Sequence, residues 1–267
     1  MTRSEAKQRL KSDRALLGTM FMEVATPGAC RMIKEAGFDF VIFDTEHSWY
    51  GVETITWLIR AARDIGLIVI IRAPAFQGNW PARYLDLGAD GMVFPHVDTA
   101  DQAADIIRQT KYPPWGERGM ANGTAHDDYH GLPMTEFTTA ANEDLLVIVQ
   151  IETALGLRNR DGILATPGVD AVFIGPNDLS LSMGYPGQLN HPEVVQAMGD
   201  ILDSARDHDV APGLHGFGVE GTLGWLDRGA RFVCHRSDIS FLIQGGREDL
   251  AVLRQHPAAK GVVGRVC

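Results

Sequence analysis

Two acidic residues stand at the ends of two consecutive apolar runs in this chain. Glu152 closes the run 147–152, and Asp178 follows the run 171–174 after a short turn. A buried parallel strand that ends on a carboxylate presents that group at the rim of its sheet. Two such groups on neighbouring strands, without Lys or Arg beside either, repel each other unless a cation lies between them. Hard oxygen ligands of this kind suit Mg²⁺ or Mn²⁺, so the sequence predicts a divalent metal site.

Other polar residues fall at the ends of the remaining apolar runs. They are Asp44, Glu46 and His47 after one run, Arg72 at the end of the next, Gln150 beside Glu152, and His215 and His235 near the last two. A metal ion and an arginine can hold negative charge on an oxyanionic intermediate, while a histidine transfers a proton. We therefore expect Arg72 to hold developing charge and His47 to handle a proton.

The elements that must position these residues alternate between strand-like and helix-like stretches. We expect strands at 16–22, 40–44, 68–72, 91–97, 145–152, 171–175, 211–215 and 231–235, and helices at 52–64, 99–111, 154–165, 192–207 and 219–228. Eight consecutive βα units in 267 residues predict an α/β protein with one domain, a (β/α)8 or TIM barrel, whose chemistry lies at the carboxyl ends of the strands. A long polar stretch at about 112–142 is expected to be a loop that serves as a lid or a subunit contact.

Composition excludes several classes of partner. The net charge is -10, which argues against nucleic acid or an anionic membrane, and no apolar run reaches the length of a membrane span. The first 14 residues lack the apolar core of a signal peptide. Cys30, Cys234 and Cys267 form an odd set without a CxxC pair, so a disulfide framework is not expected. These features predict a cytoplasmic protein.

Six blocks of the sequence, in order and spacing, resemble the 4-hydroxy-2-oxoheptanedioate aldolase family of metal-dependent (class II) pyruvate aldolases. The blocks are 38–47, 71–74, 85–89, 112–119, 150–152 and 173–180. The resemblance implies a TIM barrel that binds a 2-oxo acid such as pyruvate on Mg²⁺, Mn²⁺ or Co²⁺. Such an enzyme adds the enolate to an aldehyde, or cleaves 4-hydroxy-2-oxo acids in the reverse direction.

The resemblance also implies roles for individual residues. Glu152 and Asp178 match the metal ligands, and Arg72 matches the group that stabilises the enolate oxygen. His47 matches the proton-handling histidine, and Asp44 and Asp86 match the acids that orient it. The backbone N–H groups of Gly175 and Asn177 match the groups that bind the substrate carboxylate, and Gln150 and Phe217 match residues that line the same pocket. Thr45 departs from the family, which often has glycine there, and its bulk beside His47 could change which donor or acceptor fits. The resemblance further implies a homotrimer or homohexamer, in which the last helix, around 247–255, packs on a neighbouring subunit.

Several alternatives remain open or are disfavoured by the residues. The five lysines avoid the expected strand ends, so Schiff-base catalysis lacks its nucleophile. The stretch 126–130 imitates a zinc-protease spacing, but no Glu follows its first histidine and Gly131 and Pro133 interrupt a helix. A lyase acting on a citrate-like acid or a coenzyme A thioester is one alternative, although the chain shows no basic cluster for a nucleotide. A barrel that binds a metal or a small acid without turnover is another.

Overall fold

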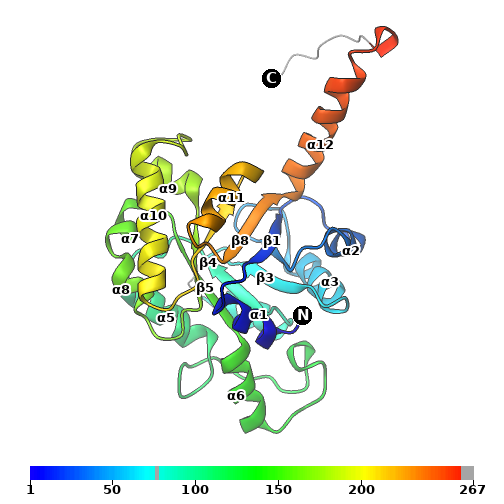
Figure 1. Ribbon diagram of the computed structural model, residues 1–267. Helices are drawn as coiled ribbons and strands as arrows, with labels where there is room; N and C mark the ends of the chain where they lie inside the picture. The colour runs from blue at the N-terminus through cyan, green and yellow to red at the C-terminus, as the bar shows by residue number, and fades with distance from the viewer. Residues whose placement is uncertain (76–77, 260–267) are drawn as a thin grey trace.

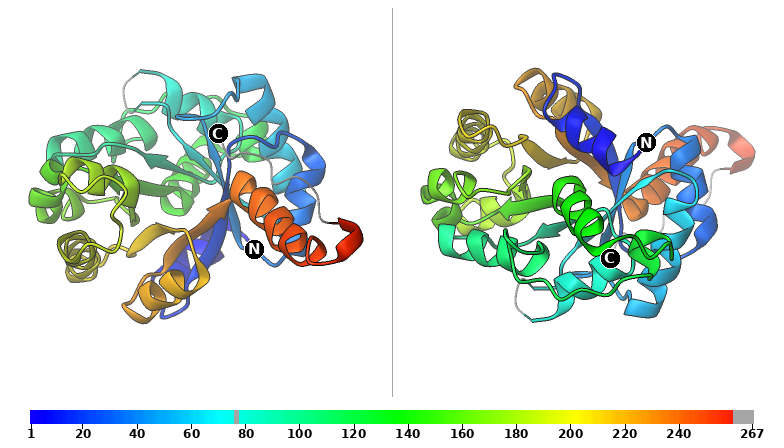
Figure 2. Two further views of the ribbon diagram at one scale, coloured as in Figure 1. Left: turned by 90° about the horizontal axis from the view of Figure 1, so that it is seen from above. Right: turned by 90° about the horizontal axis from the view of Figure 1, so that it is seen from below.

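The computed structural model describes residues 1–75 and 78–259. Eight parallel strands close into a barrel in the order in which they occur along the chain, and β1 pairs with both β2 and β8. The strands are β1 (Leu16–Phe21), β2 (Phe40–Asp44), β3 (Ile68–Arg72), β4 (Gly91–Phe94), β5 (Leu146–Ile151), β6 (Ala171–Ile174), β7 (Gly213–Gly216) and β8 (Phe232–Ser237). Helices surround the barrel (Figures 1 and 2), which confirms the predicted TIM barrel.

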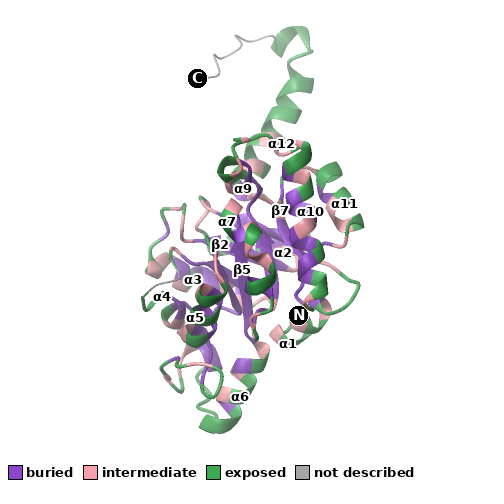
Figure 3. Ribbon diagram, turned by 90° about the vertical axis from the view of Figure 1, so that its left-hand side faces the viewer, coloured by how far each residue is buried: buried purple, intermediate pink, exposed green. Residues whose placement is uncertain are grey.

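Most helices connect one strand to the next on the outside of the barrel. They are α1 (Arg3–Leu10), α2 (Pro27–Glu35), α3 (Val52–Arg63), α4 (Trp80–Asp86), α5 (Ala100–Thr110), α6 (Met134–Asp144), α7 (Ala154–Arg158), α8 (Arg160–Leu164), α9 (Pro176–Ser182), α10 (Pro192–Asp207), α11 (Val219–Asp227) and α12 (Asp238–Leu253), with short 3₁₀ turns η1 (Ala125–Asp127) and η2 (Pro257–Ala259). Their apolar faces pack on the outer face of the strands to form a continuous core. Figure 3 shows the buried strands at the centre and α12 exposed along most of its length.

Alternate residues of each strand fill the interior of the barrel, as the two-residue period of a strand requires. Phe40 and Phe232 stack there with ring centroids 4.5 Å apart, and Phe173 meets Phe232 edge-on. Gly18 is needed beside them because a Cβ at that position would lie 2.3 Å from the Phe40 ring. The same alternation continues toward the carboxyl ends of the strands. The inward-facing residues there include polar side chains, which form the top layer of the barrel interior.

The helix α1 closes the amino end of the barrel. Its Ala6 and Leu10 pack against the inward-facing strand residues. Three of its cations pair with acids that immediately precede β4, β6 and β2: Arg3 with Asp90, Lys7 with Asp170 and Arg9 with Asp39. Each of these acids also accepts a backbone N–H from a neighbouring strand. They therefore serve the amino end of the barrel and take no part in the site at the other end.

Four expected boundaries need correction. The stretch 112–142 is not a loop throughout, because η1 and most of α6 lie within it. The fourth strand ends at Phe94, three residues early, because Pro95 has no N–H and His96 has a positive φ. The helix expected at 154–165 is divided at Asn159, which leaves the helical conformation at φ -97° and ψ 7°. The last helix begins at Asp238, well before 247.

Two further expectations concern the environment of the protein. None of the described helices is both long enough and apolar enough to cross a membrane. Within the described residues Cys30 and Cys234 are buried free thiols, and Cys267 lies outside them. Burial raises the pKa of Cys30 to about 11, so this thiol is unreactive at neutral pH.

Candidate active site

An acid and an arginine occupy matching positions on neighbouring strands at the carboxyl end of the barrel. Asp44 is the register partner of Arg72 in the pairing of β2 with β3. The Arg72 Nε and one terminal nitrogen donate to the two Asp44 oxygens at 2.8 and 2.6 Å, and both side chains are buried. Burial disfavours the charge of Arg72, but the hydrogen bonds that it donates to Asp44, together with the charges of Asp44, Glu46 and Glu152, outweigh this effect and raise the pKa of the guanidinium. The fork is therefore a fixed cation in the top layer of the barrel.

Glu46, which the sequence placed at a strand end but did not single out, lies at the centre of this group. Its Oε2 is 3.4 Å from the Arg72 Nε and 3.6 Å from the His47 Nε2, and its Oε1 is 3.5 Å from the His96 Nε2. Burial raises the pKa of Glu46, although Arg72 and the two histidines oppose that change. The acid therefore connects the fixed arginine with both histidines.

Glu152 is the second buried acid at this end. It directly follows β5, at a position that continues the inward-facing alternation of the strand, and its side chain is 1% exposed. Its Oε1 accepts the backbone N–H of His96 at 2.9 Å, and its Oε2 accepts a short hydrogen bond from the Gln150 amide. A Cβ at position 175 would lie 2.4 Å from the Glu152 Oε2, so Gly175 leaves the space that the carboxylate occupies.

The arrangement around Glu152 fits a divalent cation. Burial raises the pKa of Glu152, and the charge of Asp178, in the first turn of α9, raises it further. Within residues 1–75 and 78–259, no Lys or Arg forms an ion pair with Glu152; Arg72, whose pKa the charge of Glu152 helps to raise, is already paired with Asp44. In the described parts of the chain, no group of three or more His, Cys, Asp or Glu side chains is placed so that it could hold a metal ion. Two carboxylates, completed by substrate and water oxygens, are the ligand set that Mg²⁺ prefers.

His96 is a residue that the sequence analysis missed. It lies beyond the end of β4 with φ of 54°, and its ring is 52% exposed. The ring Nδ1 is 3.3 Å from the Glu152 Oε1, while the Nε2 faces Glu46. The sequence gives only a weak indication of its role, because His96 lies two residues after an apolar run and falls inside the strand expected at 91–97. We refer to Asp44, Glu46, Arg72, His96 and Glu152 together as the rim cluster.

Of the other predicted residues, His47 joins the rim cluster through Glu46, and its side chain is about half exposed. Gly175 and Asn177 lie on either side of Pro176, where β6 gives way to α9. Phe217 is stacked on His215 beyond β7, with ring centroids 4.6 Å apart. Burial lowers the pKa of His215 to about 4, so this ring is neutral at physiological pH.

Asp86 lies apart from the rim cluster in this chain. It is the last residue of α4, so it is near the amino end of the barrel. Its Oδ1 accepts a hydrogen bond from Arg118 at 2.6 Å and lies 3.6 Å from the His126 Nδ1. The structure of one chain therefore gives Asp86 a structural partner and does not bring it to Asp44 or His47.

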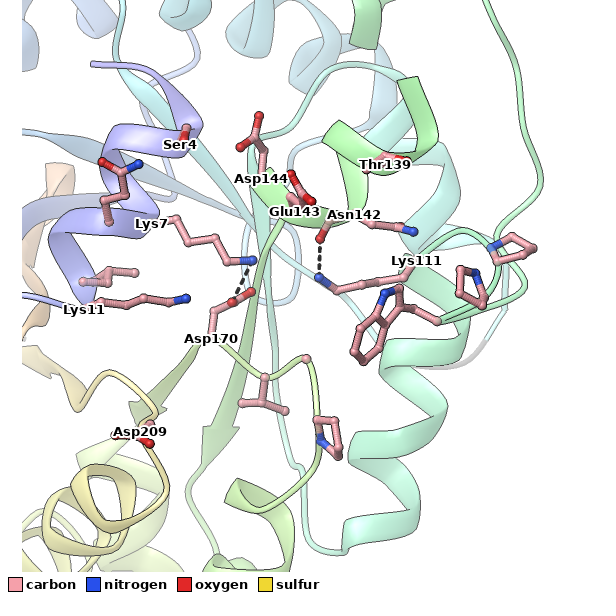
Figure 4. A pocket seen from close by; sticks show the side chains of 18 residues that line it. Ser4, Lys7, Lys11, Lys111, Thr139, Asn142, Glu143, Asp144, Asp170 and Asp209 are labelled. Atoms are coloured by element: carbon pink, nitrogen blue, oxygen red, sulfur yellow. Dashed lines mark hydrogen bonds and ion pairs between the residues drawn. The ribbon is translucent and has the colours of Figure 1, made fainter. Parts of the chain in front are cut away.

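The lysines of the described chain lie away from the rim cluster. Lys7, Lys11 and Lys111 line a cavity of about 720 Å³ between α1, the end of α5 and α6, and Figure 4 shows their side chains there. Lys34 donates to the Gly66 carbonyl, and Lys260 lies outside the described residues. Burial, with the nearby charge of Lys7, lowers the pKa of Lys111 to about 8. A lysine of this kind can serve as a nucleophile, but this one is at the opposite end from the rim cluster.

The fold agrees with comparisons to known proteins. Residues 18–244 match the family model described as HpcH/HpaI aldolase/citrate lyase, and the chain belongs to this family.

Individual relatives cover nearly the whole chain. A hydroxypyruvate/pyruvate aldolase of Paraburkholderia phytofirmans is 33% identical over 93% of this chain and 96% of its own length. A 5-keto-4-deoxy-D-glucarate aldolase of Klebsiella pneumoniae subsp. pneumoniae is 33% identical over 81% of this chain and 84% of its own length. The crystal structure of an HpcH/HpaI aldolase from Desulfitobacterium hafniense DCB-2 superposes with a TM-score of 0.90 at 31% identity, covering 94% of this chain and 97% of the other.

Proposed function

We propose that this protein is a class II aldolase, a carbon–carbon lyase that uses a divalent metal ion. It joins pyruvate or a similar 2-oxo acid, such as hydroxypyruvate, to an aldehyde, and cleaves 4-hydroxy-2-oxo acids in reverse. The observation that carries this proposal is the buried Glu152 carboxylate, close enough to Asp178 for the two charges to interact, at the same end of the barrel as the Asp44–Arg72 pair. Family membership and the two aldolase relatives support it.

In this proposal Glu152 and Asp178 hold Mg²⁺, Mn²⁺ or Co²⁺. When bound, the ion supplies Lewis acidity to the keto oxygen of the 2-oxo acid. Gln150 fixes the second oxygen of Glu152, and the absence of a side chain at Gly175 keeps space open beside it. The backbone N–H groups of Gly175 and Asn177 bind the substrate carboxylate, since Pro176 between them has none to offer.

Arg72 stabilises negative charge as it develops on the keto oxygen. Two of its nitrogen atoms are engaged by Asp44, which fixes the plane of the guanidinium and leaves the remaining terminal nitrogen to face a ligand. A preorganised cation in a place shielded from water is worth more in the transition state than a mobile one, because it does not reorganise during the reaction. Asp44 is therefore a positioning residue for Arg72.

His47 moves the proton, acting with a water molecule. Its half-exposed ring gives water access, and its Nε2 faces the Glu46 Oε2. Glu46 thus fixes the orientation of the ring from a position that also touches Arg72. The proton donor and the group that stabilises charge are held by one carboxylate, so a change in either alters the other.

A retro-aldol assay with and without chelator tests the proposed function. Incubation of the protein and Mn²⁺ with a 4-hydroxy-2-oxo acid should release pyruvate, chelator should stop the release, and added Mn²⁺ should restore it. Borohydride together with substrate should leave the activity intact, since no imine forms. A lyase that needs a citrate-like acid or a coenzyme A thioester would show release only from those substrates, and a non-catalytic barrel would bind metal and release nothing.

The C-terminal helix supports a second part of the proposal, assembly into a homotrimer or homohexamer. In Figure 1, α12 projects from the barrel, and its apolar Leu242, Val252 and Leu253 are each at least 60% exposed. A monomer seldom exposes so many large apolar side chains on one helix. Light scattering should give the mass of three or six chains, and Leu242→Asp combined with Val252→Asp should shift it toward that of one chain. An unchanged mass would remove α12 from the interface.

A further inference from the structure

His96 stands between two acids that have different tasks in the proposed mechanism. Its backbone N–H donates to the Glu152 Oε1 at 2.9 Å, and its Nδ1 is 3.3 Å from the same oxygen. Its Nε2 is 3.5 Å from the Glu46 Oε1. The one residue therefore contacts the carboxylate assigned to the metal and the carboxylate that holds His47 and Arg72.

The backbone at His96 is strained, and the strain is what creates these contacts. A φ of 54° places a residue with a side chain in the left-handed region, which residues other than glycine seldom adopt. Pro95 precedes it, and the N–H of Val97 bonds to the Gln150 carbonyl at 3.1 Å, so the chain is fixed on both sides. This conformation directs both the N–H and the ring of His96 toward Glu152.

Glu152 is consequently held at both oxygens, by His96 at Oε1 and by Gln150 at Oε2. Partners that fix the orientation of a ligand side chain usually contribute about tenfold to hundredfold to metal affinity. We propose that His96 is a positioning residue that sets the orientation of the Glu152 carboxylate for the metal and holds Glu46 at a fixed distance from it. The inference rests on the proposed function, since it takes Glu152 to be a metal ligand.

Two substitutions separate the ring from the strained backbone. His96→Gly keeps the backbone N–H to Glu152, relieves the strain and removes both ring contacts. His96→Asn tolerates the left-handed conformation and keeps a side-chain donor near Glu152, but it is too short to reach Glu46. Asp209→Gly is the matched control, because Asp209 has a φ of 57° at the opposite end of the barrel, between α10 and β7.

Calorimetric titration with Mn²⁺ and the visible spectrum of bound Co²⁺ report on the metal site without turnover. His96→Gly should weaken Mn²⁺ binding roughly tenfold to hundredfold and shift the Co²⁺ bands, whereas His96→Asn should stay within about threefold of the parent. Asp209→Gly should leave both readouts unchanged. The His96→Gly protein should unfold at or above the temperature of the parent in the absence of metal, which separates positioning from general damage.

His96→Asn should also slow the exchange of deuterium into the pyruvate methyl group, because the contact to Glu46 is lost while the metal remains. Parent-like Mn²⁺ affinity and an unchanged Co²⁺ spectrum in His96→Gly would overturn the inference. So would equal loss of affinity in both variants, which would mean that ring bulk matters and the donor does not. Failure of the parent itself to bind Mn²⁺ is a different result and would count against the proposed function.

Discussion

Replacing Glu152 with glutamine should stabilise the metal-free protein and abolish its response to metal. The carboxylate is buried, its pKa is raised by burial and by the charge of Asp178, and its only ion-pair neighbour in the described chain is His96. The Gln150 Oε1 is also buried and lacks a hydrogen-bond partner among the described residues. A flip of the Gln150 amide would present that oxygen to the new amide N–H, while the retained oxygen still accepts the His96 N–H. The substitution therefore removes a buried charge and keeps one hydrogen bond between the two side chains.

The magnitude follows from these contacts. Removal of a buried charge that has no Lys or Arg partner, with the number of hydrogen bonds to Gln150 unchanged, should stabilise the metal-free protein by about 1–3 kcal/mol. At about 2 °C per kcal/mol for a chain of this size, the melting temperature should rise by roughly 2–6 °C. The parent should gain about 2.7 kcal/mol when Mg²⁺ is at a hundred times its Kd, and Glu152→Gln should gain almost none of it.

Urea unfolding at fixed protein concentration, with chelator or with Mg²⁺, measures both effects. Asp178→Asn is the matched comparison, because Asp178 is only half-buried. It should lose the metal response but stabilise the metal-free protein less than Glu152→Gln does, since it removes only the repulsion between the two acids. A Glu152→Gln protein that is less stable than the parent without metal would show that the carboxylate is already compensated. A full response to Mg²⁺ in that variant would remove Glu152 from the metal site.

Three more predictions concern the residues around this acid. Asp44→Asn should destabilise the protein by about 3–5 kcal/mol, because it leaves the Arg72 guanidinium buried without its bidentate partner; a loss below about 1 kcal/mol in urea unfolding would mean that Glu46 replaces it. His47→Ala should lower the rate of pyruvate methyl exchange roughly 10²–10⁴-fold while pyruvate and Mn²⁺ affinities hold, and parent-like exchange would exclude His47 from the proton path. His215 has its pKa lowered to about 4, so the unfolded state takes up the proton first and stability is lost as the pH falls from about 6.5 toward 4. His215→Gln should remove at most about 3 kcal/mol of that loss, the exposed His256→Gln should remove none, and matching pH profiles for parent and His215→Gln would refute the assignment.

The sequence predicted the barrel because strand-like and helix-like stretches alternate eight times. It predicted the residues at the strand ends because side chains alternate along a strand, so every second residue up to the carboxyl end faces the barrel interior. Asp44 and Arg72 could be paired in this way without coordinates. His96 could not be found, because its role depends on a left-handed backbone beyond an apolar run, and that conformation is uncommon for any residue with a side chain. Glu46 was visible at its strand end, but only three-dimensional contacts show that it joins Arg72 to two histidines.

The role of Asp86 stays a prediction from the resemblance. Its position in a matched block implied a role beside His47, while in this chain it bonds Arg118 near the amino end of the barrel. The sequence around it reads as the end of a helix in either case, so no local signal distinguishes the two. The start of α12 at Asp238 was also not predicted. It depends on a capping box at Ser237 and Ser240, which the hydrophobic periodicity does not reveal.

Exchange of deuterium into the methyl group of pyruvate, followed by proton NMR in deuterated water, tests the central claim most directly. It requires the metal, Arg72 and His47 but no aldehyde, so the identity of the acceptor does not matter. We predict exchange with Mg²⁺, none with excess chelator, recovery when Mg²⁺ is restored, and none in Glu152→Gln at any Mg²⁺ concentration. Exchange that persists in chelator, or no exchange with Mg²⁺, Mn²⁺ or Co²⁺ in a folded parent protein, would contradict the assignment of a metal-dependent 2-oxo acid aldolase.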